Sequence, residues 1–437
     1  MSKRLYIETY GCQMNLADSE LMFGLLGREG YVRTEQPADA DVMLVNTCAV
    51  RDNAEQRVIG RVGELQRYKR AGSVLGVVGC MAQRLGPTLL EQVPRVDLVV
   101  GPDGYRNLGQ LIGLAGSGQR VSDTEFRSWE HYEDVPPVRE TGPTAFITVQ
   151  RGCDYRCTFC IVPYTRGPER SRRLVDVVRE VGEMAEQGTS EVTLLGQTVN
   201  SYHDGQHDFA DLLRAVGAVA GIRRVRFTSP YPTDFTPRVV DAMAGTPAVC
   251  EHVHLPVQSG SNVVLKRMLR RYTRERYLEV VAALRAAIPG ITFSTDIIVG
   301  FPGETEAQFR ETLSLVTDAD FDDAYTFKYS VREGTPATRL RDHVAEEVAS
   351  ERLARLIEHV RQNARRKSLG RIGQVHQVLV ERQAKRGEHM LARTRTNHLV
   401  LLDLPPDSIG EYHQVRLTGT TGSTFTGAVV TPALAVL

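Results

Sequence analysis

The sequence lacks any long hydrophobic run: none approaches the roughly 20 apolar residues that a helix needs to cross a bilayer. It also lacks a signal peptide, because the first four residues, Met1 to Arg4, lead directly into a short strand-like segment. Net charge is absent too, with 53 basic and 53 acidic residues, so any affinity for nucleic acid must come from local basic patches. These absences predict a cytoplasmic protein with no membrane partner.

Cysteine is scarce, with seven in 437 residues. The cytosol keeps thiols reduced, so the seven favour metal binding or catalysis over disulfides. Three of them, Cys153, Cys157 and Cys160, form a CxxxCxxC run with Phe159 just before the last thiol. Three thiolates can hold three irons of a cubane cluster and leave the fourth iron open. A structural zinc site is the alternative, but it normally has four ligands in paired units, and no fourth Cys or His lies nearby in sequence.

The length predicts about three domains, and the first stretch alternates strand and helix signals. Short apolar runs separated by helical patterns are typical of a parallel, flavodoxin-like α/β sheet. The predicted strands cover 5–9, 42–46, 74–78 and 96–100, and the predicted helices cover 18–28 and 54–68.

Three further cysteines, Cys12, Cys48 and Cys80, each come within four residues of the end of a predicted strand. Ligands bind at the carboxyl ends of strands in open α/β sheets, so these thiols are predicted to meet as a second three-thiolate cluster site. The alternative is three unrelated buried cysteines, which would share their strand-end position only by coincidence. Cys250 stands apart and is assigned to the core.

Beyond this sheet, a Gly-, Ser- and Pro-rich segment at 116–143 predicts a linker between domain 1–115 and a second domain at 144–371. Six strand and helix pairs in the second domain suit a partial TIM-type (β/α)6 barrel, with its site at the carboxyl ends of the strands. The last domain, 372–437, has short strands between turns, which favours a small β-barrel. The predicted strands of the second domain cover 146–150, 192–195, 225–229, 252–255, 293–299 and 325–330, and a charged helix covers 344–369.

Basic residues gather in three runs: after the CxxxCxxC loop, in the middle of the barrel, and before the last domain. One such run is usually a solvated helix face, but three together favour phosphate contact by a folded RNA. The runs are Arg166, Arg170, Arg172 and Arg173; Lys266, Arg267, Arg270, Arg271, Arg274 and Arg276; and Arg361, Arg365, Arg366, Lys367 and Arg371.

Across almost its whole length the chain resembles the tRNA methylthiotransferases of the radical S-adenosylmethionine superfamily, and within them the branch that acts on isopentenyladenosine. The last domain resembles the RNA-binding TRAM domain. The motifs that carry the resemblance are Tyr10 to Asn15, Asn46 to Arg51, Gly79 to Gln83, Cys157 to Gly167, Leu195 to Tyr202, His254 to Ser261 and Asp296 to Glu304.

The resemblance implies an enzyme that inserts sulfur at carbon 2 of a prenylated adenosine beside the tRNA anticodon and methylates that sulfur, consuming two S-adenosylmethionine molecules. It implies two 4Fe–4S clusters: an auxiliary one on Cys12, Cys48 and Cys80 that carries the sulfur, and one on Cys153, Cys157 and Cys160 that generates a 5′-deoxyadenosyl radical. The cofactors carry the chemistry, so no catalytic side chain is expected. The implied partners of this monomer are the tRNA anticodon stem-loop, an electron donor such as a flavodoxin, and a sulfur or cluster donor.

The same resemblance implies which residues contact S-adenosylmethionine. Gly196 and Gln197, after the second barrel strand, would meet the methionine amino group. Ser294, Asp296 and the glycine-rich turn at Gly300 would approach the ribose and adenine. Without the resemblance, a Gly-Phe-Pro-Gly segment after a strand would be interpreted as an ordinary turn with no ligand.

Three positions depart from the commonest family pattern: Arg151 replaces an acidic residue, Thr198 an asparagine and Tyr231 a histidine. They bear on substrate and cofactor contacts, because none is a cluster ligand. The rivals are relatives that modify threonylcarbamoyladenosine in tRNA or an aspartate of a ribosomal protein, and a non-catalytic iron–sulfur RNA-binding protein. The motifs Gln197 to Tyr202 and Ile161 to Arg166 favour the prenyladenosine enzyme.

Overall fold

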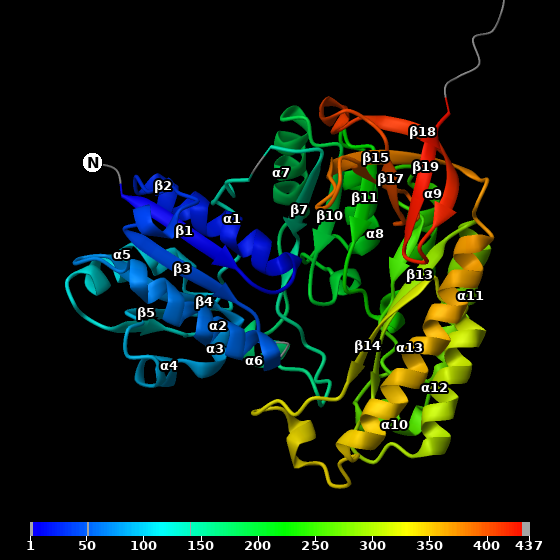
Figure 1. Ribbon diagram of the computed structural model, residues 1–437, viewed down its shortest axis with the longest axis horizontal. Helices are drawn as coiled ribbons and strands as arrows, with labels where there is room; N and C mark the ends of the chain where they lie inside the picture. The colour runs from blue at the N-terminus through cyan, green and yellow to red at the C-terminus, as the bar shows by residue number, and fades with distance from the viewer. Residues whose placement is uncertain (1–2, 50–51, 140, 431–437) are drawn as a thin grey trace, which may run out of the picture.

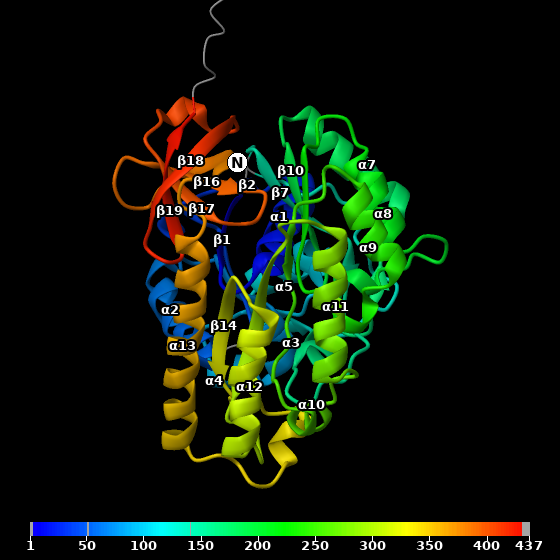
Figure 2. The ribbon, with the colours of Figure 1, turned by 90° about the vertical axis from the view of Figure 1, so that its right-hand side faces the viewer.

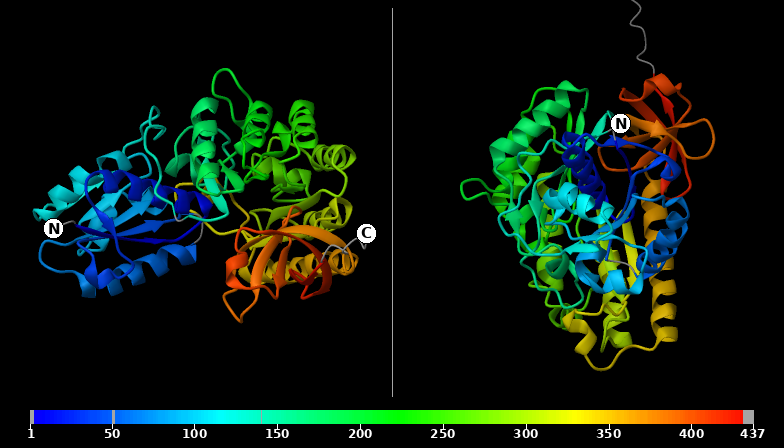
Figure 3. Two further views of the ribbon diagram at one scale, coloured as in Figure 1. Left: turned by 90° about the horizontal axis from the view of Figure 1, so that it is seen from above. Right: turned by 90° about the vertical axis from the view of Figure 1, so that its left-hand side faces the viewer.

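The computed structural model describes residues 3–49, 52–139 and 141–430. It shows an N-terminal α/β domain beside a larger barrel-like domain, with a small β-barrel at the far side of the latter (Figures 1 and 3). Val50 and Arg51, the last two residues of one family motif, lie outside the described residues. Over the described ranges, no helix is both long enough and apolar enough to cross a membrane.

The N-terminal domain contains a six-stranded parallel sheet in the order β2-β1-β3-β4-β5-β6. Both faces of this sheet are covered, and its central strands β3 and β4 are buried at every position. Leu44 packs with α1 (Gln13–Arg28) and α5 (Leu108–Gly116) on one face, and Val45 packs with α2 (Asp52–Leu65) and α3 (Cys80–Leu85) on the other. The flavodoxin-like prediction is confirmed. The strands are β1 (Arg4–Thr9), β2 (Val32–Arg33), β3 (Val42–Thr47), β4 (Val74–Gly79), β5 (Leu98–Val100) and β6 (Val121–Asp123).

Both predicted helices of this domain are present, and three more, α3, α4 and α5, were not predicted. The first helix begins at Gln13 and not at Asp18, because polar residues in its first turns are buried against the rest of the protein: Asn15 and Asp18 are both 0% exposed. The helices are α1 (Gln13–Arg28), α2 (Asp52–Leu65), α3 (Cys80–Leu85), α4 (Thr88–Gln92) and α5 (Leu108–Gly116).

The first part of the segment predicted as a linker, 116–143, belongs to the N-terminal domain. Its strand β6 pairs with β5 at the sheet edge, and Tyr132 and Val135 are buried in the core beside α1. Arg139 then forms ion pairs with Glu20 of α1 and Glu180 of the next domain. The segment therefore packs across the boundary between the two domains.

Helix α1 contains two glycines that allow a matched stability test. A methyl group at Gly24 would lie 2.3 Å from the carbonyl oxygen of Pro136, whereas at exposed Gly27 it would meet nothing within 4 Å. We expect Gly24→Ala to destabilise the protein by about 1–3 kcal/mol because the crossing segment must move. Gly27→Ala should stabilise it by up to about 1 kcal/mol through helix propensity alone. Thermal unfolding midpoints measure both, and a stabilising Gly24→Ala would contradict this packing.

The second domain has six parallel strands in two sheets, ordered β7-β10-β11 and β12-β13-β14. A parallel bridge between Val225 and Val249 connects β11 to the segment before β12. This is the predicted partial (β/α)6 barrel. Its main strands are β7 (Thr144–Thr148), β10 (Glu191–Leu195), β11 (Arg224–Phe227), β12 (His252–His254), β13 (Thr292–Val299) and β14 (Asp323–Lys328), with a short pair β8 (Gln150–Arg151) and β9 (Arg170–Ser171).

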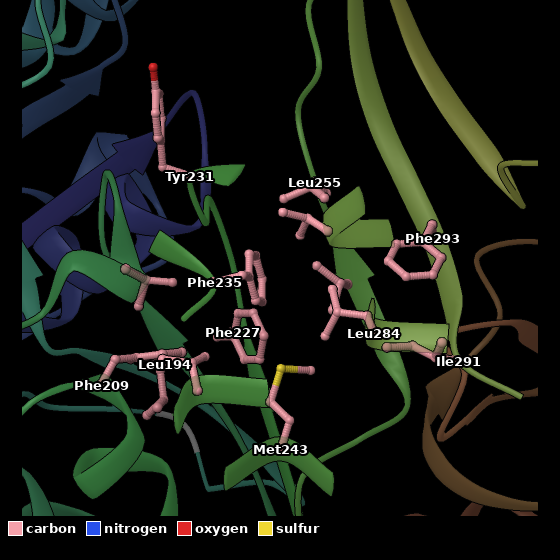
Figure 4. Close-up of a cluster of buried hydrophobic side chains, with 14 of the residues drawn as sticks. Leu194, Phe209, Phe227, Tyr231, Phe235, Met243, Leu255, Leu284, Ile291 and Phe293 are labelled. Carbon is pink, nitrogen blue, oxygen red and sulfur yellow. The ribbon is translucent and has the colours of Figure 1, made fainter. Parts of the chain in front are cut away.

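The two halves of this barrel share one apolar core. Figure 4 shows Leu194 and Phe227 of the first sheet facing Leu255 and Phe293 of the second half, with Met243 between them. Helices α11, α12 and α13 stand along one side of the domain (Figure 2). The helices are α6 (Val162–Thr165), α7 (Leu174–Glu186), α8 (Phe209–Gly217), α9 (Pro237–Gly245), α10 (Asn262–Arg267), α11 (Arg274–Ala287), α12 (Glu306–Ala319) and α13 (Glu346–Leu369).

The C-terminal segment forms a closed five-stranded barrel in the order β15-β16-β17-β19-β18, as predicted. It docks on the amino-terminal ends of the strands of the second domain. Arg224, at the start of β11 and 0% exposed, donates to the carbonyls of Arg393 and Gln377, and Thr292, at the start of β13, donates to the carbonyl of Thr396. The strands are β15 (Val375–Gln383), β16 (Met390–Thr394), β17 (Leu399–Leu402), β18 (Tyr412–Thr420) and β19 (Thr424–Val429).

Candidate functional site

The CxxxCxxC loop follows β7 and β8 at the carboxyl end of the first barrel strand, where the fold places reactive groups. Its backbone is tied down: the amide of Cys153 donates to the carbonyl of Gly167, and the amide of Cys160 to the carbonyl of Cys157. Cys153 and Cys157 are buried and Cys160 is half-buried. The loop therefore presents three fixed thiols, close enough that a charge on Cys157 acts on both of the others.

Burial, with a smaller contribution from the neighbouring Cys157, raises the pKa of Cys153 to about 11 and that of Cys160 to about 12. These thiols are protonated at neutral pH in the metal-free protein. Metal binding must displace the protons, because only the thiolate is a ligand. Arg270 donates from Nη1 to the sulfur of Cys157 at 3.4 Å, so one cationic group already faces this site.

The other three cysteines follow β1, β3 and β4, which are neighbours in the sheet. Cys48 and Cys80 are buried, and Cys12 is exposed. Their loops touch: a side chain at Gly11, which has φ +127°, would lie 2.6 Å from Cβ of Cys48. The structure thus brings together the three loops that the sequence predicted to meet.

Two asparagines from the family motifs hold these loops in register. The Asn15 side chain donates to the Asn46 amide oxygen at 3.1 Å and to the Thr47 carbonyl at 3.0 Å, and Asn46 donates back to the Asn15 carbonyl at 2.8 Å. The Asn15 oxygen also accepts from the Cys12 thiol at 3.3 Å. Both amides are 0% exposed, so the polar residues of these motifs position the cysteine loops.

The loops of the two cysteine triads contact each other across the domain boundary. Helix α3, which begins at Cys80, packs on α6, which follows Cys160 (Figure 1), and Cys80 shares a small buried cluster with Ile161. Arg166, at the end of α6, donates from Nε to the Cys80 sulfur at 3.2 Å. The two triads therefore belong to one continuous site.

Gly196 and Gln197 lie where the cysteine loop meets the second barrel strand. The Gln197 side-chain oxygen accepts from the backbone amide of Gly152 at 2.6 Å. A Cβ at Gly196 would lie 2.6 Å from the Gln150 side-chain oxygen and 2.9 Å from the Cα of Val199, so a side chain there would require the backbone to shift. Next to them, Thr198 places its hydroxyl 4.0 Å from the Cys153 sulfur, which brings one of the three family departures to the loop.

Ser294 and Asp296 are linked by His254, which lies on the neighbouring strand β12. His254 Nδ1 lies 2.9 Å from the Ser294 hydroxyl, and its Nε2 lies 3.4 Å from an Asp296 carboxylate oxygen. Gly300, in contrast, has φ +71° and packs against Ala349 of α13. Its turn is shaped by close backbone packing, and its amide donates to the Glu304 carboxylate.

Stacked aromatic and arginine side chains lie beside the cysteine loop. Tyr231, another departure, stacks on Tyr155 with ring centroids 3.7 Å apart, and Arg270 lies 4.3 Å from the Tyr231 ring centre. Beside them is a pocket of about 560 Å³. Its lining includes four basic side chains and no acidic one: Arg156, Lys266, Arg270 and Arg271, with Asn262, Leu269, Tyr272 and Thr273.

The prediction that the first basic run contacts RNA phosphates is wrong for three of its four members. Arg166, Arg170 and Arg172 are buried in ion pairs with carboxylates, because they fasten the cysteine loop to its surroundings. Only Arg173 is largely exposed. In the third run, Arg366, Lys367 and Arg371 form ion pairs with Asp320 and Asp322. A sequence pattern shows that charges cluster but not that their partners are intramolecular.

Sequence reasoning missed Asp18, Glu169 and Arg270 as parts of this site. Glu169 accepts from Ser201 and Thr198 beside the cysteine loop, and burial raises its pKa. Asp18 lies six residues after Cys12, as Arg166 lies six after Cys160. A charged residue at that spacing was visible in the sequence, although its partner was not.

The residues of both triads fit iron–sulfur clusters by donor type, since thiolates are the ligands of such clusters. Within the described part of the chain, no three Cys, His, Asp or Glu side chains stand close enough together to bind one metal ion. In a four-iron cluster each thiolate binds a different iron, so the three sulfurs need not converge on one point.

Two sequence-family models match the chain. The one described as the Radical SAM superfamily matches residues 147–316, and the one described as Uncharacterized protein family UPF0004 matches residues 4–101. The first match contains the CxxxCxxC loop and β13, and the second contains Cys12, Cys48 and Cys80.

Curated relatives match over nearly the whole chain, and each is named tRNA-2-methylthio-N(6)-dimethylallyladenosine synthase. The protein of Koribacter versatilis is 43% identical over 436 residues, covering 98% of both chains. That of Alkalilimnicola ehrlichii is 44% identical, covering 96% of this chain and 95% of its own. That of Geobacillus thermodenitrificans is 45% identical, covering 99% of this chain and 85% of its own.

Solved structures share the fold at low sequence identity. The radical S-adenosylmethionine methyltransferase TsrM from Kitasatospora setae, with cobalamin and a [4Fe-4S] cluster bound, superposes with a TM-score of 0.59 at 17% identity, covering 77% of each chain. The cobalamin-dependent S-adenosylmethionine radical enzyme OxsB gives 0.54 at 13% identity, covering 83% of this chain and 56% of its own.

Proposed function

Because the chain belongs to the tRNA-2-methylthio-N(6)-dimethylallyladenosine synthase family of radical S-adenosylmethionine enzymes, we propose that it adds a methylthio group at C2 of N6-dimethylallyladenosine next to the tRNA anticodon. One observation carries this proposal: two cysteine triads lie on loops that touch across a domain boundary. Insertion and methylation of sulfur would consume two S-adenosylmethionine molecules per turnover.

Cys153, Cys157 and Cys160 would hold one 4Fe–4S cluster, and Cys12, Cys48 and Cys80 would hold a second, auxiliary one. When bound, these groups supply the electron that cleaves S-adenosylmethionine and the sulfur that enters the product. The protein's own residues bind and orient them. Gln197 anchors the cysteine loop, Asn15 and Asn46 set the auxiliary loops, and the burial of four of the six thiols excludes water from reactive intermediates.

The contacts with S-adenosylmethionine remain those implied by family position: Gly196 and Gln197 toward the methionine moiety, and Ser294, Asp296 and Gly300 toward the ribose and adenine. The link of His254 to both Ser294 and Asp296 supports this assignment for the two of them, because it fixes two side chains that lie on the same face of β13. Gly300 would contribute through its backbone, because its packing leaves no room for a side chain.

We propose the basic pocket beside Arg270 as a contact surface for tRNA phosphates, since four cations and no acidic side chain line it. The double variant Lys266→Glu/Arg271→Glu should weaken tRNA binding at least about tenfold and flatten its salt dependence by about one unit per lost phosphate contact. Filter binding across a salt series measures both effects. Arg179→Glu/Arg310→Glu, which reverses two exposed cations outside the pocket and outside the three basic runs, is the control. Equal losses in both variants would contradict the assignment.

The remaining partners follow from the chemistry. Reduction of a cluster needs an electron donor such as a flavodoxin, and repeated turnover needs a sulfur or cluster donor. We place the protein in the cytoplasm as a monomer, with its tRNA substrate. The terminal barrel would add a second RNA-binding surface.

The test is anaerobic reconstitution, iron analysis and mass analysis of nucleosides from prenylated tRNA incubated with S-adenosylmethionine, reductant and sulfide. About eight irons per chain and a 2-methylthio product are expected. A tRNA carrying threonylcarbamoyladenosine should give no methylthio product, and modification of that tRNA alone would replace the proposed substrate. About four irons and no product on either tRNA would overturn the two-cluster proposal.

A further inference from the structure

Arg166 belongs to the radical S-adenosylmethionine domain, yet its guanidinium ends beside a cysteine of the N-terminal domain. Its Nε donates to the Cys80 sulfur at 3.2 Å, and its Nη2 lies 2.7 Å from Oδ2 of Asp18 in α1. Arg166 is 3% exposed and Asp18 is 0% exposed. Both charges are therefore out of water, between the two cysteine triads.

The positive charge at this point exceeds the negative charge. Asp18 has a second cationic partner, because Arg151 donates from Nη1 to its Oδ1 at 2.9 Å. Two buried arginines thus share one carboxylate. A buried charge without a partner is costly, and Nη1 of Arg166 has no hydrogen-bond acceptor among the residues described. An anionic group beside Cys80 would supply both the missing charge and the missing acceptor.

We propose that Arg166 is a positioning residue of the N-terminal cluster site: it orients Cys80 as a ligand and donates to the sulfur atoms of the bound cluster. This inference rests on the two-cluster function proposed above. Hydrogen bonds to sulfur and nearby positive charge set the reduction potential of iron–sulfur clusters, both making reduction easier. The auxiliary cluster is therefore tuned by a residue of the other domain.

Arg170 provides a matched comparison in the same loop. It also crosses the domain boundary, donating from Nη1 and Nη2 to the two carboxylate oxygens of Asp103, each at 2.9 Å, and it is 7% exposed. Its partners among the described residues are Asp103 and the backbone carbonyls of Arg127 and Arg166, and none is a cysteine. Loss of Arg170 therefore weakens domain docking and one contact to the Arg166 backbone, whereas loss of Arg166 removes docking and the sulfur contact.

The experiment uses the full chain with Cys153→Ala, Cys157→Ala and Cys160→Ala, so that only the auxiliary cluster remains visible. After anaerobic reconstitution, iron content and an electron paramagnetic resonance redox titration are recorded for this background and for Arg166→Gln, Arg166→Lys and Arg170→Gln. We expect Arg166→Gln to shift the midpoint potential to more negative values, Arg166→Lys to shift it less, and Arg170→Gln to leave it unchanged.

An unchanged potential in Arg166→Gln, or equal shifts in Arg166→Gln and Arg170→Gln, would overturn the inference. If Arg166→Gln takes up no iron, the Arg166→Lys variant provides the test, because lysine keeps the positive charge but lacks the Nε donor. An unchanged midpoint potential in Arg166→Lys would then contradict the proposed role of Arg166. A background protein that binds no iron with Arg166 intact refutes the two-cluster function itself, which separates that failure from the failure of Arg166.

Discussion

Cys157→Ala should abolish reductive cleavage of S-adenosylmethionine, with a fall in 5′-deoxyadenosine formation of at least about 100-fold. The thiol lies in the middle of the CxxxCxxC loop, is buried, and accepts a hydrogen bond from Arg270. Two remaining thiolates cannot hold three irons, so the cluster of this loop is lost. Chromatography of the nucleoside products after addition of a chemical reductant measures the effect.

The same variant should retain the auxiliary cluster, so its iron content should fall from about eight to about four per chain. Cys250→Ala is the matched control: Cys250 is also buried, at 2% exposure, but it belongs to neither triad. We expect that control to keep full iron content and full cleavage. Unchanged cleavage by Cys157→Ala would remove the radical role from this loop.

Cys48→Ala should have the opposite profile: cleavage of S-adenosylmethionine continues while the methylthio product disappears. Cys48 follows β3, the middle of the three neighbouring strands that carry the N-terminal triad, and Gly11 of the first loop packs on it. Its loss should therefore release the auxiliary cluster and its sulfur. Mass analysis of nucleosides from prenylated tRNA detects the missing product.

The comparison of the two variants separates radical generation from sulfur supply. Cys157→Ala removes the first and Cys48→Ala the second, with about four irons left in each. Full thiolation by Cys48→Ala would overturn the sulfur-carrying role of the N-terminal triad. Loss of cleavage in both variants would instead show that the two sites fold or load only together.

Apolar periodicity was sufficient to predict most of the fold. The central strands of the N-terminal sheet, β3, β4 and β5, are mostly apolar runs buried at every position, so their type and order could be predicted from the sequence. The start of α1 was predicted incorrectly, because the apolar pattern begins at Asp18 whereas the helix begins at Gln13. The polar residues in between, Asn15 among them, are helical because their partners lie in distant loops.

The meeting of Cys12, Cys48 and Cys80 at one sheet edge follows from strand topology, and so it was predictable. The partners of buried charges were not. Arg166 has the appearance of a solvent-facing cation in a basic run, but Asp18 is 148 positions away in sequence. Only the docking of the two domains brings that pair together, and no local pattern encodes docking.

The terminal barrel lies far from the cysteine loops. This barrel docks at the amino-terminal ends of the strands, through Arg224 and Thr292, whereas the cysteine loops lie at the opposite ends. The longest of these strands, β13, has 8 residues, which at about 3.3 Å per residue spans roughly 26 Å. An RNA that contacted the terminal barrel and the cysteine loops at once would therefore have to span that distance, about the length of the barrel strands.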